Sequence, residues 1–257
     1  MIVLLPPSES KNPAPRRGRP LDIGALSFPE LNPTRERVLA ALVATSARSD
    51  APSRLLVGKT LAAEVERNIS LATIPTRPAL ETYTGALFAA LDPGSLSTTA
   101  RRRAGSRLVI VSSLWGALRP RDRIPPYRLN ICANLLDLEA LEPLWRPVLG
   151  PVLTAAAGAD GLVVDCRSSS YLAMGMPQGI GRRLVSIRVL RPDGRRGADG
   201  HTAKRVRGEV VRHLLESAAD PATAEDLAEM LAGSWQVRLT GSNHEESPRE
   251  IQIALSS

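Results

Sequence analysis

The sequence is poor in aromatic residues, in lysine and in cysteine. Only 3% of its 257 residues are Phe, Trp or Tyr, which argues against a sheet surface of rings stacking on single-stranded bases. Lysine occurs three times, at Lys11, Lys59 and Lys204, so arginine supplies most of the positive charge. The two cysteines, Cys132 and Cys166, do not have the spacing of a metal site.

Long hydrophobic runs are also missing. The longest uncharged, mostly apolar stretch, residues 108–118, is shorter than the roughly 20 residues that a membrane-spanning helix needs. The apolar residues 1–5 run directly into Pro6-Pro7 with no basic residues before them, which is unlike a signal peptide. We therefore expect a cytoplasmic protein that does not bind membranes and keeps both thiols free.

The composition is that of a folded globular chain. Its 43% hydrophobic and 23% charged residues exclude disordered and fibrous classes, and the length suffices for one large core. No internal repeat or linker divides the sequence. We predict one compact domain over residues 1–257, with a mixed α/β (α+β) fold because helical and strand-type patterns alternate.

Hydrophobic periodicity predicts the individual elements. Strands are predicted over residues 2–5, 108–112, 161–165, 184–190, 235–240 and 250–255. Helices are predicted over residues 34–47, 59–70, 79–91, 202–217 and 222–232. For the last of these we predict Asp220 as N-cap and Pro221 as the first helical residue. Residues 136–157 are helical in composition, but we expect Pro143, Pro147 and Pro151 to break the helix.

Positive charge is concentrated in two segments. Residues 101–128 hold eight arginines and one acid, and residues 182–212 hold ten basic and three acidic residues. Each segment has a net charge of +7, and the remainder of the chain has −7. If the two segments meet in the fold, they form a basic cleft that attracts an anion. Otherwise they are separate solvated surfaces.

Several familiar motifs are absent or incomplete. Residues 57–60 (VGKT) resemble the end of a phosphate loop, but Ser53 stands where its first glycine belongs. The sequence contains neither a dinucleotide fingerprint nor a nucleophile elbow. The three histidines do not pair with cysteines or acids at ligand spacing. We predict no metal site and no cofactor.

Chemistry-bearing residues gather in turn-rich motifs. Tyr127 and Trp115 stand beside Pro, Gly or Ser, and Arg128 and Arg119 flank them as possible phosphate or carboxylate ligands. Between these arginines, Asp122 can orient one of them or act as a base.

A second group lies on the helix predicted from residue 202. Lys204, Arg205, Gly208 and Arg212 share the side opposite its apolar face. Gly208 leaves room for a ligand or for another backbone, and the spacing does not choose between them.

The order of these motifs resembles the peroxide stress protein YaaA family over nearly the whole chain. The resemblance is carried by residues 6–11 (PPSESK), 83–85 (YTG), 112–129 (SSLWGALRPRDRIPPYRL), 164–171 and 204–212. The sequence departs from the family pattern at six positions: Glu9, Ser113, Trp115, Asp165, Ser169 and Ser170. At the first of these the family has its loop lysine, and here Lys11 follows two positions later.

The resemblance implies a compact mixed α/β domain with a positively charged cleft and a helix-hairpin-helix-like element. The counterpart of that element here is residues 55–66. The resemblance further implies a role in hydrogen peroxide stress, where family members limit damage from free iron, and binding to DNA, including distorted or damaged forms.

Two functions follow as hypotheses, and for both we expect a monomer. In the first, the protein binds DNA, with an anion-binding set of Lys11, Lys59, Ser112, Trp115, Arg119, Arg128, Lys204, Arg205 and Arg212. In the second, it is an enzyme that acts on a nucleotide, a nucleobase or another anionic small molecule in the same cleft. Its candidate catalytic residues are Asp122, Tyr127, Asp165, Ser168, Tyr171 and Lys204.

Overall fold

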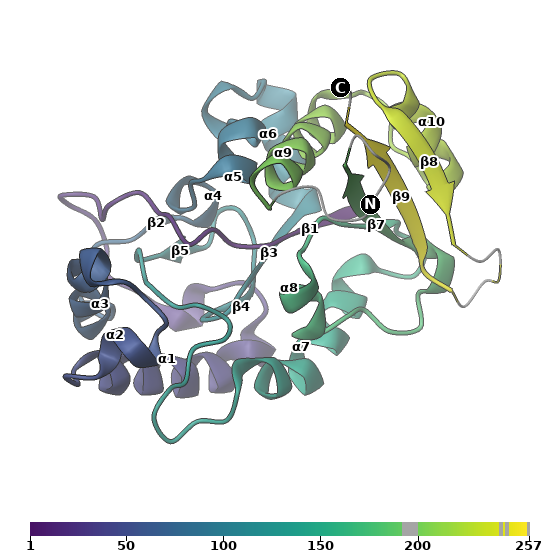
Figure 1. Ribbon diagram of the computed structural model, residues 1–257. Helices are drawn as coiled ribbons and strands as arrows, with labels where there is room; N and C mark the ends of the chain where they lie inside the picture. Colours follow the sequence, from purple (N-terminus) through teal and green to yellow (C-terminus); the bar gives the residue numbers. More distant parts are fainter. Residues whose placement is uncertain (192–199, 242–243, 245–246, 256–257) are drawn as a thin grey trace.

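A mixed β-sheet forms the centre of the protein. The computed structural model describes residues 1–191, 200–241, 244 and 247–255, and within them seven strands lie in the order β4-β3-β1-β6-β7-β9-β8 (Figure 1). The strands are β1 (Ile2–Leu5), β3 (Leu108–Ser112), β4 (Gly116–Leu118), β6 (Val163–Asp165), β7 (Leu184–Leu190), β8 (Gln236–Thr240) and β9 (Arg249–Ala254). Neighbours from β3 to β9 are parallel, and β4 and β8 add antiparallel edges.

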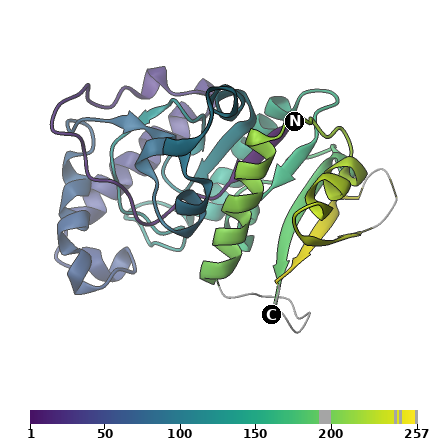
Figure 2. The same cartoon turned by 90° about the horizontal axis from the view of Figure 1, so that it is seen from above.

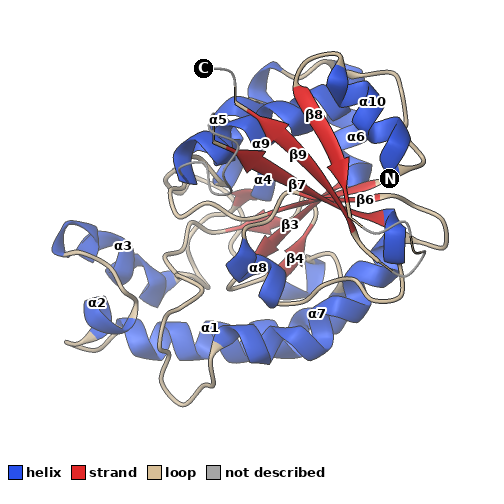
Figure 3. Ribbon diagram, turned by 45° about the vertical axis from the view of Figure 1, so that its right-hand side comes forward, coloured by secondary structure: helices blue, strands red, loops and turns tan. Residues whose placement is uncertain are grey.

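Helices lie on both sides of this sheet, as the mixed α/β prediction requires. On one side are α5 (Ala86–Leu91), α6 (Thr98–Arg107) and α9 (Gly200–Glu216), and on the other are α1 (Asn32–Ser46) and α7 (Leu141–Ala157) (Figures 1 and 3). The remaining α-helices of the described residues are α2 (Ala51–Arg54), α3 (Ala62–Arg67), α4 (Ala79–Thr82), α8 (Ser169–Ala173) and α10 (Ala224–Ala232). A separate antiparallel pair joins β2 (Arg77–Pro78) to β5 (Arg123–Ile124).

The residue pattern explains which strands are central. Every residue of β1, β3 and β6 is buried, which is typical of parallel strands covered on both faces. In β7 and β9 the buried and partly exposed residues alternate. One face of these outer strands therefore packs in the core, and the other carries polar side chains such as Arg188 and Glu250.

Helix α7 continues through prolines that were expected to interrupt it. Pro147 and Pro151 lie inside the helix, and Pro143 lies in its first turn. A proline leaves the carbonyl four residues earlier without a helical partner. The four-residue spacing places all three prolines on one exposed face, where water can bind those carbonyls.

Two predicted helices have different boundaries in the structure. The predicted helix 79–91 is wrong as one unit, because the chain breaks between α4 and α5 at Gly85, which has a φ of 91°. The amide of Thr84 there donates to Ser10, outside the helix. The N-cap predicted at Asp220 is also wrong: Thr223 caps α10 and forms a reciprocal capping box with Asp226.

The basic segment 182–212 is only partly placed. Asp193, Arg195, Arg196 and Asp199 contribute to its charge but lie outside the described residues. No helix among the residues that the structure describes is long and apolar enough to cross a membrane.

Candidate functional site

The sheet has a topological switch point between β1 and β6. From β1 the chain continues to β3 on one side, whereas from β6 it continues to β7 on the other side. In open α/β sheets, ligands bind beyond the carboxyl ends of the strands at such a point. A ligand site is therefore expected at the residues that follow β1 and β6.

A cleft of about 560 Å³ lies at this point. Five segments form its walls: the loop 6–10 after β1, residues 84–88 at the start of α5, residues 130–132, Ser168, Ser170 and Tyr171 at α8, and residues 200–207 at the start of α9. Its volume is in the range that small-molecule sites occupy.

Helix α9 brings two cations to the cleft, Lys204 and Arg207. Their spacing of three residues places them on the same side of the helix. Lys204 is exposed, and Arg207 is buried and donates from Nε to the carbonyl of Ile187 at 3.3 Å. Burial lowers the pKa of Arg207 from its ordinary value. Because Glu9 is the one acid that lines this cleft among the described residues, the cations can attract an anion there.

A lysine and two tyrosines form a cluster beside the cleft. The Lys11 Nζ atom lies 4.1 Å from the centre of the Tyr127 ring and 5.5 Å from that of Tyr83. It also donates to the carbonyls of Ser8 and Glu9, at 2.8 and 3.2 Å. Burial and the neighbouring Arg128 lower the pKa of Lys11 to about 7. At neutral pH a large fraction of this amine is therefore uncharged and can accept a proton.

Hydroxyl groups extend the cluster into the core. The Tyr127 hydroxyl lies 3.0 Å from that of Tyr83 and 2.6 Å from Ser112 Oγ. The amides of Leu114 and Trp115 both donate to Ser112 Oγ, so its own proton is directed to Tyr127. Burial raises the pKa of both tyrosines well above the ordinary value, which keeps them protonated.

The predicted site residues divide into three groups. Ser168, Tyr171 and Lys204 line the cleft. Lys11, Ser112, Tyr127 and Arg128 lie close by, in the tyrosine cluster or bonded to the cleft-lining Glu9. The other seven do not line the cleft, although Trp115 contacts the Tyr127 ring: Lys59, Trp115, Arg119, Asp122, Asp165, Arg205 and Arg212.

Asp122 and Arg119 hold a turn far from the cleft. The Asp122 carboxylate accepts hydrogen bonds from the amides of Ser27 and Arg119 and from the Ser27 hydroxyl. Arg119 lies over the Phe28 ring and donates to the carbonyls of Ser106 and Leu108. These carbonyls stand before or at the first residue of β3, whereas the cleft is at the opposite end of the sheet.

Trp115 and Asp165 belong to the core. Trp115 has no exposed surface, and its ring contacts Tyr127 edge-on. Asp165 forms a fully buried ion pair with Arg167, with 2.7 Å between Oδ2 and Nη2. Arg167 also donates to the carbonyls of Tyr171 and Gly175, so the pair fixes the chain that carries Tyr171 to the cleft.

The remaining predicted cations make contacts outside the cleft. Arg205 pairs with Glu209 on the surface of α9, and Arg212 donates to the carbonyls of Leu91 and Asp92 at the end of α5. Lys59 is exposed in the segment between α2 and α3. These two helices lie at the end of the molecule opposite β8 (Figure 1).

Sequence reasoning missed four residues of the site: Tyr83, Asn130, His201 and Arg207. Helical periodicity would have found Arg207, because it follows Lys204 by three residues. The YTG motif contained Tyr83, but nothing in the sequence indicated its contact with Tyr127. Asn130 and His201 gave no sequence signal.

Gly208 serves the packing of two helices. A Cβ atom at this position would lie 2.2 Å from the carbonyl oxygen of Leu87 and 2.9 Å from the Cβ of Ala90. Its role is therefore to let α9 approach α5, which lies beside it in Figure 2. Of the two roles that the sequence left open, the structure favours the approach of another backbone.

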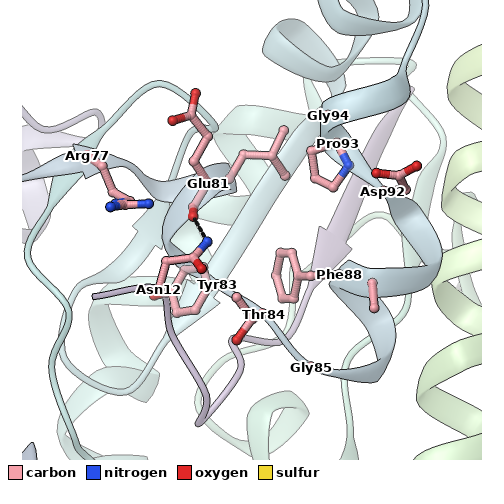
Figure 4. Close-up of a pocket in the computed structure, with 12 residues that line it drawn as sticks. Asn12, Arg77, Glu81, Tyr83, Thr84, Gly85, Phe88, Asp92, Pro93 and Gly94 are labelled. Carbon is pink, nitrogen blue, oxygen red and sulfur yellow. Dashed lines mark hydrogen bonds between the residues drawn. The ribbon is translucent and has the colours of Figure 1, made fainter. Parts of the chain in front are cut away.

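A second hollow, of about 440 Å³, adjoins the tyrosine cluster (Figure 4). It shares Thr84, Gly85 and Phe88 with the cleft, so these residues separate the two spaces. In this hollow Asn12 donates to the carbonyl of Glu81 at 2.8 Å, and Arg77 lies at its edge. No group of three His, Cys, Asp or Glu side chains suited to a metal occurs in the described part of the chain.

Comparison with known proteins gives one consistent family. A family model described as "Peroxide stress protein YaaA" matches residues 1–239. A UPF0246 protein of Streptomyces coelicolor is 44% identical over 234 residues, which cover 90% of this chain and 89% of the relative. A UPF0246 protein of Corynebacterium efficiens is 37% identical and covers 91% of this chain and 93% of its own length. A UPF0246 protein of Corynebacterium glutamicum is 34% identical, and the match covers 96% of this chain and 98% of the relative.

Proposed function

Because the chain belongs to the peroxide stress protein YaaA family, we propose that it acts in the response to hydrogen peroxide by binding a phosphate-bearing ligand in its cleft. The observation that carries this proposal is the presence of Lys204 and Arg207 in a cleft at the switch point of the sheet. Such a position is where α/β proteins bind nucleotides and other phosphates.

Several groups around the cleft favour phosphate. Helix α9 has 17 residues and its first residues, Gly200 and His201, line the cleft, so the positive end of its dipole is directed there. Lys204 and Arg207 add charged donors, and the Ser168 hydroxyl adds a neutral one. Together they supply the donors that a phosphate group requires.

DNA is the first source of phosphate that we propose. Arg16, Arg17 and Arg19 are exposed in the loop after β1, and Lys59 is exposed between α2 and α3. Residues 55–66 would act as the helix-hairpin-helix-like element, with its amides and Lys59 directed at the DNA backbone. Bound in this way, the protein would limit iron-dependent damage to DNA during peroxide stress.

A free nucleotide, processed by an enzyme, is the second candidate. Its support is the Lys11 amine, whose pKa of about 7 suits proton transfer at neutral pH, beside the hydroxyls of Tyr127 and Tyr83. A cleft of about 560 Å³ also suits a small molecule better than a duplex.

Binding experiments separate the two sources. Labelled duplex DNA, AMP and inorganic phosphate would each be titrated into the protein at about 50 mM and about 200 mM salt. Salt-sensitive binding of DNA alone supports the first source, and binding of AMP with none of DNA supports the second. Lys204→Gln should weaken binding of the true ligand at least about tenfold.

Arg205→Gln is the matched control, because this substitution also removes one positive charge from α9, one residue away from Lys204. Arg205 pairs with Glu209 outside the cleft, so its loss should not affect a ligand bound there. Its effect should stay below about twofold. Equal binding by wild type and Lys204→Gln, or no binding of any of the three probes, would overturn the proposal. Greater peroxide sensitivity of a strain without the gene, relieved by an iron chelator, would support the cellular role.

A further inference from the structure

Two donors at the edge of the cleft hold both oxygens of one carboxylate. Arg128 Nη2 donates to Glu9 Oε2 at 2.7 Å, and Asn130 Nδ2 donates to Glu9 Oε1 at 2.8 Å. A pair of donors that meets the two oxygens of a single group has the geometry by which proteins recognise carboxylates and phosphates. Both Glu9 and Asn130 line the cleft.

The two donors are held by contacts other than the Glu9 carboxylate. Asn68 is fully buried and holds the Arg128 backbone; its side chain accepts from the Arg128 amide and donates to the Arg128 carbonyl, both at 2.9 Å. The Arg128 guanidinium also donates from Nη1 to the backbone carbonyl of Glu9 at 3.4 Å, a bond that does not involve the Glu9 side chain. The Asn130 Oδ1 atom accepts from the amide of Cys132 at 2.8 Å, which directs its Nδ2 group toward the carboxylate. The donor pair is therefore ready for any anion of suitable shape.

The arginine is more deeply buried than the carboxylate that it binds. The Arg128 side chain is 11% exposed and that of Glu9 is 54% exposed. Within the described residues, the buried Nε atom of Arg128 has no hydrogen-bond partner, and its other acidic neighbour, Glu64, lies at 3.6 Å. A half-exposed carboxylate on a surface loop is easier to displace than the arginine beneath it.

The loop that carries Glu9 is attached on both sides of it. The Ser10 carbonyl accepts from the Thr84 amide, and the Lys11 Nζ atom binds the carbonyls of Ser8 and Glu9. These bonds use the backbone and leave the Glu9 side chain free to turn. A rotation of that side chain into solvent opens Arg128 and Asn130 without unfolding the loop.

We propose that Arg128 and Asn130 form a subsite for the carboxylate or phosphate group of a ligand, and that Glu9 of the same chain occupies it until the ligand displaces it. This inference rests on the proposed binding of an anion in the cleft, and it places one charged group of that anion against Arg128 and Asn130. Glu9 then lowers the apparent affinity by the fraction of time that it fills the subsite.

Inorganic phosphate and succinate, titrated into the full chain and followed by thermal shift and calorimetry, test this proposal. If Glu9 fills the subsite about nine-tenths of the time, Glu9→Gln should bind the probes about tenfold more tightly than wild type. Adding Arg128→Gln to Glu9→Gln should abolish that gain. Circular dichroism and the melting temperature without ligand would establish that each variant folds.

Glu64→Gln is the control, because it removes the same charge near Arg128 but not the carboxylate between the two donors. Its affinity should stay within about twofold of wild type. An equal gain in both variants, or no gain in Glu9→Gln, would refute the subsite. DNA or AMP binding that depends on Lys204 while Glu9→Gln shows no gain would reject the subsite and keep the proposed function. Tighter binding of phosphate and succinate by Glu9→Gln, with no binding of DNA or AMP, would support the subsite and reject the proposed function.

Discussion

The Nζ atom of Lys11 lies 4.1 Å from the centre of the Tyr127 ring. The ammonium form gains from the ring face and from two backbone carbonyls, but it loses hydration and lies near Arg128. Loss of hydration is the largest effect, and the pKa of Lys11 falls from 10.5 to about 7.

The stability of the protein should depend on pH through Lys11. Below pH 7 the folded and unfolded chains both bind the proton, so the folded state carries the full cost of the buried charge. Between pH 7 and 10.5 the unfolded chain holds a proton that the folded chain has released, so this residue destabilises less as pH rises. In urea unfolding, the free energy of unfolding of wild type minus that of Lys11→Met should increase by up to about 1.4 kcal/mol per pH unit from pH 7 to 9.

The comparison with Lys11→Met cancels the contributions of Glu9, Glu64, Arg128 and the nearby tyrosines, which are present in both proteins. A stability difference that does not change between pH 7 and pH 9 would contradict a lowered pKa for Lys11.

The buried pair Asp165–Arg167 should show strong coupling. Asp165→Asn leaves a buried guanidinium without its counter-charge, which should cost about 3–5 kcal/mol of unfolding free energy. The double variant Asp165→Asn, Arg167→Met should be destabilised by less than the sum of the two single changes. A double-mutant cycle by urea denaturation measures this, and simple additivity would show that the pair is not coupled.

Two glycine-to-alanine substitutions in helices should have opposite effects. At Gly208 the new Cβ would lie 2.2 Å from the Leu87 carbonyl, so α9 and α5 must separate and the melting temperature should fall. At Gly105, inside α6, nothing lies within 4 Å of the new atom. There alanine should stabilise by about 0.5–1 kcal/mol through its helix propensity. A tolerated Gly208→Ala would contradict the close packing.

The two thiols should react at very different rates. Cys132 is exposed, whereas Cys166 is buried and burial raises its pKa to about 12. Iodoacetamide at pH 8 should therefore modify Cys132 in the folded protein, and Cys166 only after denaturation. Mass spectrometry of peptides reads out both sites, with Cys132→Ser as control. Equal labelling of the two in the native state would be inconsistent with the buried position of Cys166.

Much of the fold was predictable because it depends on local patterns. The strands at 2–5, 108–112 and 184–190 are confirmed at those residues, since continuous or alternating apolar runs are a property of the sequence itself. The break at Gly85 and the Thr223 cap were missed. The first depends on contact with the loop after β1, and the second on a choice between neighbouring capping residues.

The candidate site was less predictable, because charge and residue type do not reveal partners. Of the arginines proposed as anion ligands, Arg119 and Arg212 donate instead to backbone carbonyls, which a sequence cannot show. The motif from 112 to 129 divides in the structure: Ser112, Tyr127 and Arg128 lie near the cleft, whereas Asp122 lies beyond the other end of the sheet.

The sequence by itself determined the family, the mixed α/β class and most strands, because these follow from motif order and hydrophobic period. Only the tertiary structure decided which residues share one place. In the folded chain the ends of β1 and β6 lie side by side, and Lys11 Nζ lies over the Tyr127 ring. The Glu9 carboxylate accepts hydrogen bonds from Arg128 and Asn130. The physical reason is that these contacts join residues far apart in the chain, and no local propensity specifies which distant side chain will meet another.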